Sequence, residues 1–280
     1  MAIRSNQQLT SQQVLCQCSL DAILLHPSFP IQFSVHRDAA MTLSACHLDR
    51  TKSVPRQKRQ KPYQIMTLHE FRKTYRMGSL QRDRMKHDPV DQFREWFEAM
   101  SSLEDLPDWW EVNAMTLSTT APQGPITSRI VLLKGFSDQG FLFFTNYQSR
   151  KGKQLAACNQ AALNFYWPMM ERQVRIEGWV EKAPSSISDQ YFYSRPIDSQ
   201  CGAIASPQSS VIQEDHRLEE AVSVMLSQAD DHPPRRPDHW GGFLLRPELF
   251  EFWQGKPSRL HDRYQYRKTE SGWLLERLAP

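Results

Sequence analysis

The spacing of apolar residues first becomes regular at Asp88, where a helix is predicted to begin. Asp88 can accept a hydrogen bond from a helix N-terminus, and Pro89 suits the first helical position. Apolar residues then recur every three or four positions, at Val90, Phe93, Trp96, Phe97 and Met100. This stripe predicts an amphipathic helix that packs on a hydrophobic core.

After this helix, short β-like runs alternate with turn residues. Strands are predicted at residues 113–119, 127–136, 141–146, 161–167, 173–181, 242–246, 249–253, 263–267 and 273–278. Helices are predicted at residues 151–158, 185–194 and 215–228. Many short antiparallel strands with a few helices predict an α+β fold and favour a β-barrel.

Residues 1–65 differ in composition from the rest of the chain. They carry eight Lys/Arg, three Asp and no Glu, a net charge of +5, which leaves −2 of the total of +3 for residues 66–280. This segment is predicted to be a disordered extension, and residues 66–280 one domain. A mitochondrial presequence, a nucleic-acid or nuclear-import patch at residues 52–61, and a leader upstream of a true start at Met66 stay open as alternatives.

Cysteine usage and hydropathy exclude several protein classes. The five cysteines are odd in number and lack the spacing of a disulfide framework, and Cys16-x-Cys18 has no paired partners for zinc, so no metal is expected. Reduced thiols indicate a cytoplasmic protein, with mitochondrial targeting by residues 1–65 left open. No run approaches the roughly 18 apolar residues of a membrane span, so no membrane partner is expected.

Residues 251–263, EFWQGKPSRLHDR, hold the densest recognition chemistry. If the second half of this segment is extended, alternation places Arg259, His261 and Arg263 on one face. Two guanidiniums and an imidazole repel each other unless an anion lies against them, so this pattern predicts a phosphorylated or carboxylated ligand. A solvated basic edge strand is the alternative.

Further groups of cations and hydroxyls also favour phosphate. They are Arg129–Lys134, Phe144-Thr145-Asn146 with Ser149–Lys153, Tyr191 with Ser194-Arg195-Pro196 and Ser199, and Ser206–Ser210. Gln173 and Arg175 alternate with apolar neighbours, and a Gln amide suits a heteroaromatic ring with imide edges, although a surface strand has the same pattern. No Walker-type loop and no G-x-G-x-x-G is present, so neither a P-loop nor a Rossmann site is expected.

Seven motifs in this chain, in this order, resemble the pyridoxamine 5′-phosphate oxidase family. They are RIVLLK (129–134), FFTN (143–146), SRKG (149–152), RQVR (172–175), SRP (194–196), QSS (208–210) and WQG…RLHDR (253–263). The resemblance extends from about Phe71 to Pro280 and implies an FMN-binding split β-barrel of Greek-key type with flanking helices. It also implies a homodimer with FMN at the interface.

The resemblance assigns roles to individual residues. It implies FMN contacts from Arg129, Ile130, Val131, Leu132, Phe144, Thr145, Arg150, Lys151, Gln173, Gln208, Ser209, Trp253 and Arg263. It implies substrate contacts from Arg72, Lys73, Thr74, Tyr75, Lys134, Tyr191, Arg195, Ser199, Arg259, Leu260 and His261. Arg259 and His261 are the expected catalytic residues, and residues 72–75 match a segment that can fold over the substrate.

The implied reaction is the oxidation of pyridoxamine 5′-phosphate and pyridoxine 5′-phosphate to pyridoxal 5′-phosphate. O2 would be the electron acceptor, H2O2 a product, and ammonia a second product from the amine. The alternatives are a split-barrel flavin reductase and a protein that binds flavin or pyridoxal phosphate without turnover. A nucleic-acid-binding module using residues 52–61 is an alternative of another class, although the net charge of residues 66–280 argues against a nucleic-acid partner.

Overall fold

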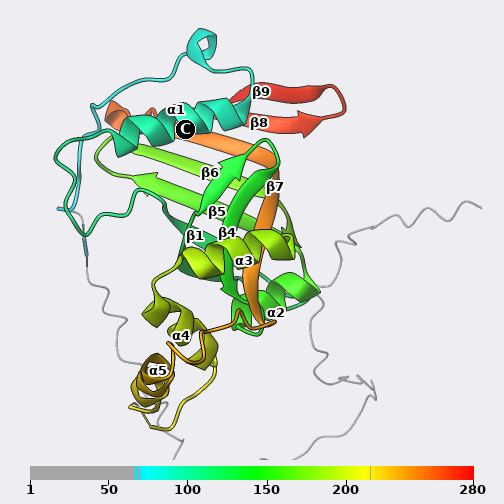
Figure 1. Cartoon of the computed structure of the whole chain (residues 1–280). Helices are drawn as coiled ribbons and strands as arrows, with labels where there is room; N and C mark the ends of the chain where they lie inside the picture. Colours follow the sequence, from blue (N-terminus) through cyan, green and yellow to red (C-terminus); the bar gives the residue numbers. More distant parts are fainter. Residues whose placement is uncertain (1–66, 69, 215) are drawn as a thin grey trace, which may run out of the picture. The chain divides into compact units, whose positions relative to one another are not determined.

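A nine-stranded antiparallel sheet organises the part of the chain that the computed structural model describes, residues 67–280 except 69 and 215 (Figure 1). The strands are β1 (Ala114–Thr119), β2 (Thr127–Leu132), β3 (Gly135–Ser137), β4 (Gly140–Asn146), β5 (Gln160–Trp167), β6 (Arg172–Lys182), β7 (Trp240–Gln254), β8 (Asp262–Thr269) and β9 (Gly272–Leu278). The helices are α1 (Pro89–Ser101), α2 (Arg150–Ala157), α3 (Ser185–Ser194), α4 (Ile197–Ala205) and α5 (Arg217–Ser227), with short 3-10 turns η1 (Arg82–Arg84) and η2 (Pro257–Arg259). In this part of the chain, no helix has the length and apolar character needed to cross a membrane. The expectations for residues 1–65 lie outside the described residues.

The order of the strands shows that the sheet curls. The order is β2-β1-β5-β6-β7-β4-β3, so β2 and β3, which follow each other in the chain, lie at opposite ends of it. The Leu133 N–H donates to the Asn113 carbonyl at 2.9 Å, and the Lys134 N–H donates to the Leu142 carbonyl at 2.8 Å. These two bonds join opposite edges, and the resulting half-barrel confirms the predicted α+β fold with an antiparallel split barrel.

The core lies between α1 and the inner face of the sheet. The Phe93 ring meets the rings of Phe141 and Phe165 edge-on, each at a centroid distance of 5.0 Å, and all three side chains are fully buried. The predicted cap is also present, since the Val90 N–H donates to Asp88 Oδ1 at 2.7 Å. The helical spacing read from the sequence therefore predicted this helix and its buried face correctly.

At two places the sequence predicted the wrong number of strands. The predicted strand 127–136 is divided into β2 and β3, because the chain crosses from one edge of the sheet to the other at Leu133–Lys134. The predicted strands 242–246 and 249–253 are one strand, β7. Pro247, which separates the two predicted strands, lies where the register between β6 and β7 shifts beside Gly178, and a β-bulge tolerates a proline.

Two other local predictions also differ from the structure. Helix α4 was not among the predicted helices, and Pro196 directly precedes its first turn. The second half of segment 251–263 was expected to be extended. It forms η2, with left-handed φ values of 57° at Ser258 and 60° at Arg259, and β8 begins only at Asp262. Arg259, His261 and Arg263 therefore do not alternate along one strand.

We predict that Phe93→Ala lowers the free energy of unfolding by about 3–5 kcal/mol, because it leaves a cavity among fully buried rings. Denaturant unfolding followed by fluorescence measures this change. Glu98→Ala on the exposed side of the same helix is the control and should change stability by less than about 0.5 kcal/mol. Equal effects of the two substitutions would contradict the placement of α1.

Candidate functional site

Arg129 is held on the inner side of β2 by neighbouring hydroxyl groups. Its Nη1 donates to the Leu117 carbonyl at 3.0 Å and to Thr119 Oγ1 at 2.6 Å, and its Nη2 donates to Thr127 Oγ1 at 2.5 Å. Both hydroxyls donate in turn to Gln154 Oε1 on α2, at 2.8 and 2.7 Å. The guanidinium is thus fixed between the sheet edge and α2.

The N-terminus of α2 brings more polar groups to the same place. Ser149 caps this helix, accepting from the Gly152 N–H at 3.2 Å. Lys151 Nζ donates to Gln208 Oε1 at 2.7 Å, and Thr145 Oγ1 donates to the same oxygen at 3.1 Å. Residues that the resemblance assigns to FMN thus meet here from β4, α2 and the loop after α4.

Electrostatics indicate that these cations are arranged for an anion. Burial and the charge of Arg129 lower the pKa of Lys151 to about 8, while burial and Arg150 lower the pKa of Arg129. Within the described residues, none of these three side chains forms an ion pair with a carboxylate. We call Arg129, Arg150 and Lys151 the first cationic cluster; with the N-terminus of α2 beside it, it suits a phosphate.

A second cationic cluster, Lys134 and Arg195, lies near Tyr191 and Trp240. Lys134 Nζ is 5.8 Å from the centroid of the Tyr191 ring, and the Arg195 guanidinium is 5.1 Å from that of Trp240. Arg195 and Ser199 line a cavity of about 310 Å³. The Arg195 Nη1 atom is buried without a hydrogen-bond partner in the described residues, which favours an acceptor in this cavity.

The two cationic clusters adjoin. Gln208, which accepts from Lys151, lines the cavity of Arg195 and also a cavity of about 440 Å³ beside Arg150 and Ser209. The Phe144 ring stacks on the Tyr191 ring of the second cationic cluster at a centroid distance of 4.1 Å. The structure therefore places two anion-suited regions side by side.

A third region lies at the other end of β7, in a cavity of about 430 Å³ that we call the aromatic cavity. The expected residues 72–75 line it together with Trp253, Arg259 and His261, although they are far apart in sequence. The Tyr75 ring lies edge-on to Trp253 at 5.6 Å and to His261 at 5.5 Å. Leu260, also expected at the substrate, is 64% exposed and is not among the residues that line this cavity.

His261 is set up as a neutral hydrogen-bond donor. Its Nδ1 accepts from the Lys256 backbone N–H at 3.1 Å, so the proton of the neutral imidazole lies on Nε2. Burial and the neighbouring Arg259 lower the pKa of His261, which favours the neutral form at neutral pH.

Arg263 differs from the cations of the first cationic cluster because it has an internal counter-ion. Its Nε donates to Glu251 Oε1 at 2.7 Å, and Arg175 Nη2 lies 2.8 Å from Glu251 Oε2. Glu251 is almost fully buried, and its bond raises the pKa of Arg263. An external anion is therefore not needed to balance the whole charge of Arg263, because Glu251 supplies part of the negative charge.

The remaining expected FMN residues lie on β2 and on β6 to β8. Gln173, Trp253 and Arg263 are direct neighbours on β6, β7 and β8. Ile130, Val131 and Leu132 follow Arg129 on β2, and Ile130 is 64% exposed.

Within one chain, the second cationic cluster and the aromatic cavity lie too far apart to contact the same small ligand. Trp240, at the second cationic cluster, and Trp253, at the aromatic cavity, are thirteen residues apart on β7. At ~3.3 Å per residue, this separation is about 40 Å along the strand. Figure 1 shows β7 with α3 and α4 near one end and β8 beside the other.

The chain is similar to known proteins over most of its length. Residues 104–227 match a family model described as pyridoxamine 5′-phosphate oxidase, and residues 240–280 match one described as the pyridoxine 5′-phosphate oxidase C-terminal dimerisation region. A pyridoxine/pyridoxamine 5′-phosphate oxidase of Burkholderia lata is 50% identical over 219 residues, 77% of this chain and 100% of the relative. The relative of that name from Salinibacter ruber is 48% identical over 216 residues, 76% of this chain and 99% of the relative. The chain belongs to the pyridoxine/pyridoxamine 5′-phosphate oxidase family, and it is an oxidoreductase.

Solved structures share the fold. PhzG from Burkholderia lata 383, in complex with tetrahydrophenazine-1-carboxylic acid, is 26% identical with a TM-score of 0.65, covering 71% of this chain and 95% of that protein. A pyridoxamine 5′-phosphate oxidase-related, FMN-binding protein from Nostoc punctiforme has a TM-score of 0.54 at 17% identity, covering 70% of this chain and 100% of that protein. The second likeness concerns the fold alone.

Sequence reasoning missed residues that hold the site rather than bind a ligand. Gln154 orients the hydroxyls around Arg129, Trp240 lies under Arg195, and Glu251 joins Arg175 to Arg263. Only Glu251 could have been found from the sequence. It lies in the apolar run FEFW (250–253), where a buried charge needs a partner of opposite charge.

We predict that affinity for FMN falls as pH rises through about 8, because Lys151 then loses its proton and its charge. Equilibrium titrations at pH 6.5 to 9.5 measure this change. Lys151→Arg, which keeps its charge, should flatten the profile. A profile that is the same with Lys or Arg at position 151 would exclude Lys151 from anion binding.

Proposed function

We propose that the protein is an FMN-dependent oxidase that converts pyridoxamine 5′-phosphate and pyridoxine 5′-phosphate to pyridoxal 5′-phosphate. O2 is the proposed electron acceptor, with H2O2 as a product and ammonia as a second product from the amine. The observation that carries the proposal is the pair of adjoining cationic clusters, which supply separate places for a cofactor phosphate and a substrate phosphate. We place the reaction in the cytoplasm, as the cysteine usage indicates.

The first cationic cluster supports FMN as the cofactor. Besides burial, Arg150 lowers the pKa of Arg129, and Arg129 lowers that of Lys151. The three cations lack carboxylate partners in the described part of the chain, so a phosphate there would relieve their repulsion. Gln173 and Trp253 lie toward the other end of β7, so they would face the flavin ring from a second copy of the chain. FMN supplies the acceptor for the hydrogen and electron pair that the substrate loses.

The second cationic cluster and the aromatic cavity supply the proposed substrate contacts. Lys134, Arg195 and Ser199 would bind the substrate phosphate, while Arg259 and His261 would lie near the pyridine ring. His261 would donate a hydrogen bond through Nε2. Arg259 lowers the pKa of His261, and the same repulsion would favour the free-base form of the substrate amine.

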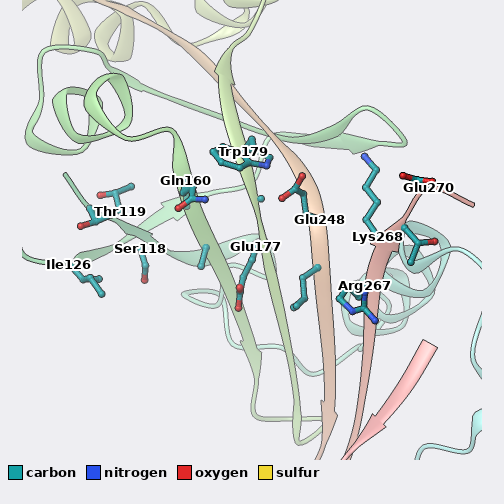
Figure 2. Close-up of a pocket in the computed structure, with 16 residues that line it drawn as sticks. Ser118, Thr119, Ile126, Gln160, Glu177, Trp179, Glu248, Arg267, Lys268 and Glu270 are labelled. Carbon is teal, nitrogen blue, oxygen red and sulfur yellow. The ribbon is translucent and has the colours of Figure 1, made fainter. Parts of the chain in front are cut away.

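The separation of these regions along β7 supports a homodimer as the functional unit. The second cationic cluster and the aromatic cavity lie toward opposite ends of one strand, so a second copy is needed to bring them to one substrate. A groove of about 880 Å³ on the outer face, shown in Figure 2, suggests where that copy lies. Glu248, Leu249 and residues 267–270, which line it, belong to the matched dimerisation region, and Ile126 at its rim is 76% exposed.

The first test is purification of the full chain, measurement of its flavin absorbance, and assay with pyridoxine 5′-phosphate in air. We expect a yellow protein that forms aldehyde and H2O2. Arg259→Ala should reduce turnover at least about 100-fold while FMN stays bound, because the proposal assigns Arg259 a contact with the substrate and none with FMN. A colourless protein that takes up no added FMN would refute the proposal, and a yellow one without turnover would favour a flavin-binding relative without oxidase activity.

We also predict that two inactive variants complement each other. Arg195→Ala and Arg259→Ala alter regions that a homodimer would combine from different chains. After subunit exchange in a one-to-one mixture, half of the dimers hold one intact site, so about a quarter of wild-type activity should return. Activity that stays at the level of the separate variants would show that each chain builds its site alone.

A further inference from the structure

Glu171 is a buried carboxylate in the turn between β5 and β6, and none of the site motifs includes it. The residue is 3% exposed and has a left-handed φ of 53°, which is unusual for a residue other than glycine. Its Oε2 accepts from two consecutive backbone N–H groups, those of Arg76 at 2.6 Å and Met77 at 2.9 Å. We call residues 71–77 the covering segment; Glu171 holds its C-terminal end.

Glu171 also makes contacts on two other sides. Lys73 Nζ lies 3.5 Å from its Oε1, and its backbone carbonyl accepts from the Gly255 N–H at 2.8 Å. Burial alone would raise the pKa of Glu171, but the two backbone N–H groups and Lys73 outweigh burial and lower it. One ionised residue therefore joins the covering segment to the end of β7.

A second carboxylate, that of Asp262, directly follows the loop of residues 255–261 and also binds the N-terminal part of the domain. Asp262 Oδ2 accepts from the Leu80 N–H at 2.9 Å, and its Oδ1 lies 3.3 Å from Lys256 Nζ and 3.0 Å from Arg277 Nη2. The loop that carries Arg259 and His261 is thus bounded at both ends by residues bonded to the N-terminal part of the domain.

These anchors determine the position of Tyr75. Its ring packs directly against Gly255, where an added Cβ would lie 2.7 Å from Tyr75 Cδ1. The same ring lies edge-on to Trp253 and His261. Since Arg76 is the next residue, the bond from its N–H to Glu171 fixes the backbone that presents this ring.

We propose that Glu171 is a positioning residue that holds the covering segment as a wall of the aromatic cavity and keeps Tyr75 against His261. The loop on the opposite wall contains two left-handed residues, Ser258 and Arg259, a conformation that costs free energy and persists only when its surroundings fix it. The covering segment supplies that support. The role in catalysis rests on the proposed function, whereas the anchoring itself does not.

The charged groups around His261 determine the direction of the expected pH effect. Arg259 and Lys256 lie on its own loop, and Arg72, Lys73 and Tyr75 face it from the covering segment. Release of this segment would expose His261 to water. Because burial is the largest cause of its lowered pKa, this exposure raises the pKa of His261 toward its ordinary value.

The test is Glu171→Gln in the full-length, FMN-loaded protein. A glutamine cannot present two anionic oxygens to two N–H groups and an ammonium, so the segment should detach more often. We expect KM for pyridoxine 5′-phosphate to rise about tenfold, kcat to change less than about threefold, and FMN affinity to stay within about twofold. The acidic limb of the kcat/KM profile should move to higher pH, and His261, followed by NMR titration, should show the same rise in pKa.

Two further variants separate positioning from general damage. Gly255→Ala displaces Tyr75 while leaving the Glu171 carboxylate in place, and it should reproduce the rise in KM and in the pKa of His261. Glu181→Gln, on β6 and ten residues after Glu171, is exposed and paired with Arg246 at 2.7 Å, and it should change neither quantity. Unchanged KM and unchanged His261 titration in both Glu171→Gln and Gly255→Ala would overturn the proposal.

Failure of the proposed function gives a different result. If the wild-type protein binds FMN but turns over no substrate, the oxidase assignment fails, and the titration of His261 in the resting protein still tests the position of the covering segment. A pKa that rises in Glu171→Gln and Gly255→Ala but not in Glu181→Gln supports the anchoring. The same pKa in all four proteins refutes it.

Discussion

The continuous pairing of β7 is the constraint on which the rest of the structure depends. This strand bonds to β6 along nearly its whole length, to β4 over its first half and to β8 over its second. The bulge beside Gly178 lets the strand bend without losing its partners. Trp240 at its first residue and Trp253 near its last are therefore held in rigid surroundings, as ligand-binding residues require.

The site uses its positive charges in two different ways. Arg129, Arg150 and Lys151 lie together without carboxylate partners among the described residues, which leaves their charge available to a ligand. Arg263 is bonded to a buried glutamate that fixes its direction instead. Cations without a carboxylate partner can contribute affinity for an anionic ligand. A cation in a buried ion pair contributes a fixed orientation instead, at the cost of desolvating both charges.

The sequence predicted local features well and long-range features poorly. Alternation at Val174 and Ile176 and the cap at Asp88 depend on neighbouring residues, and both agree with the structure. The continuity of β7 through Pro247 depends on the bulge beside Gly178, nearly seventy residues away in the chain. The functional motifs were found because their residue types are distinctive, but the partners that hold them come from distant strands. Glu171 is an example, since its contacts with Arg76 and Met77 span 95 and 94 residues.

The shared position of Gln208 has a thermodynamic consequence. Its Oε1 accepts from Lys151 and Thr145, and its side chain lines the cavities of both cationic clusters. A ligand that reorients this amide in one cavity changes the hydrogen bonds offered in the other. Linkage is reciprocal, so the factor by which the first ligand changes affinity for the second equals the factor by which the second changes affinity for the first. Any coupling of this kind between the two cavities would therefore act equally in both directions through the one amide group that they share.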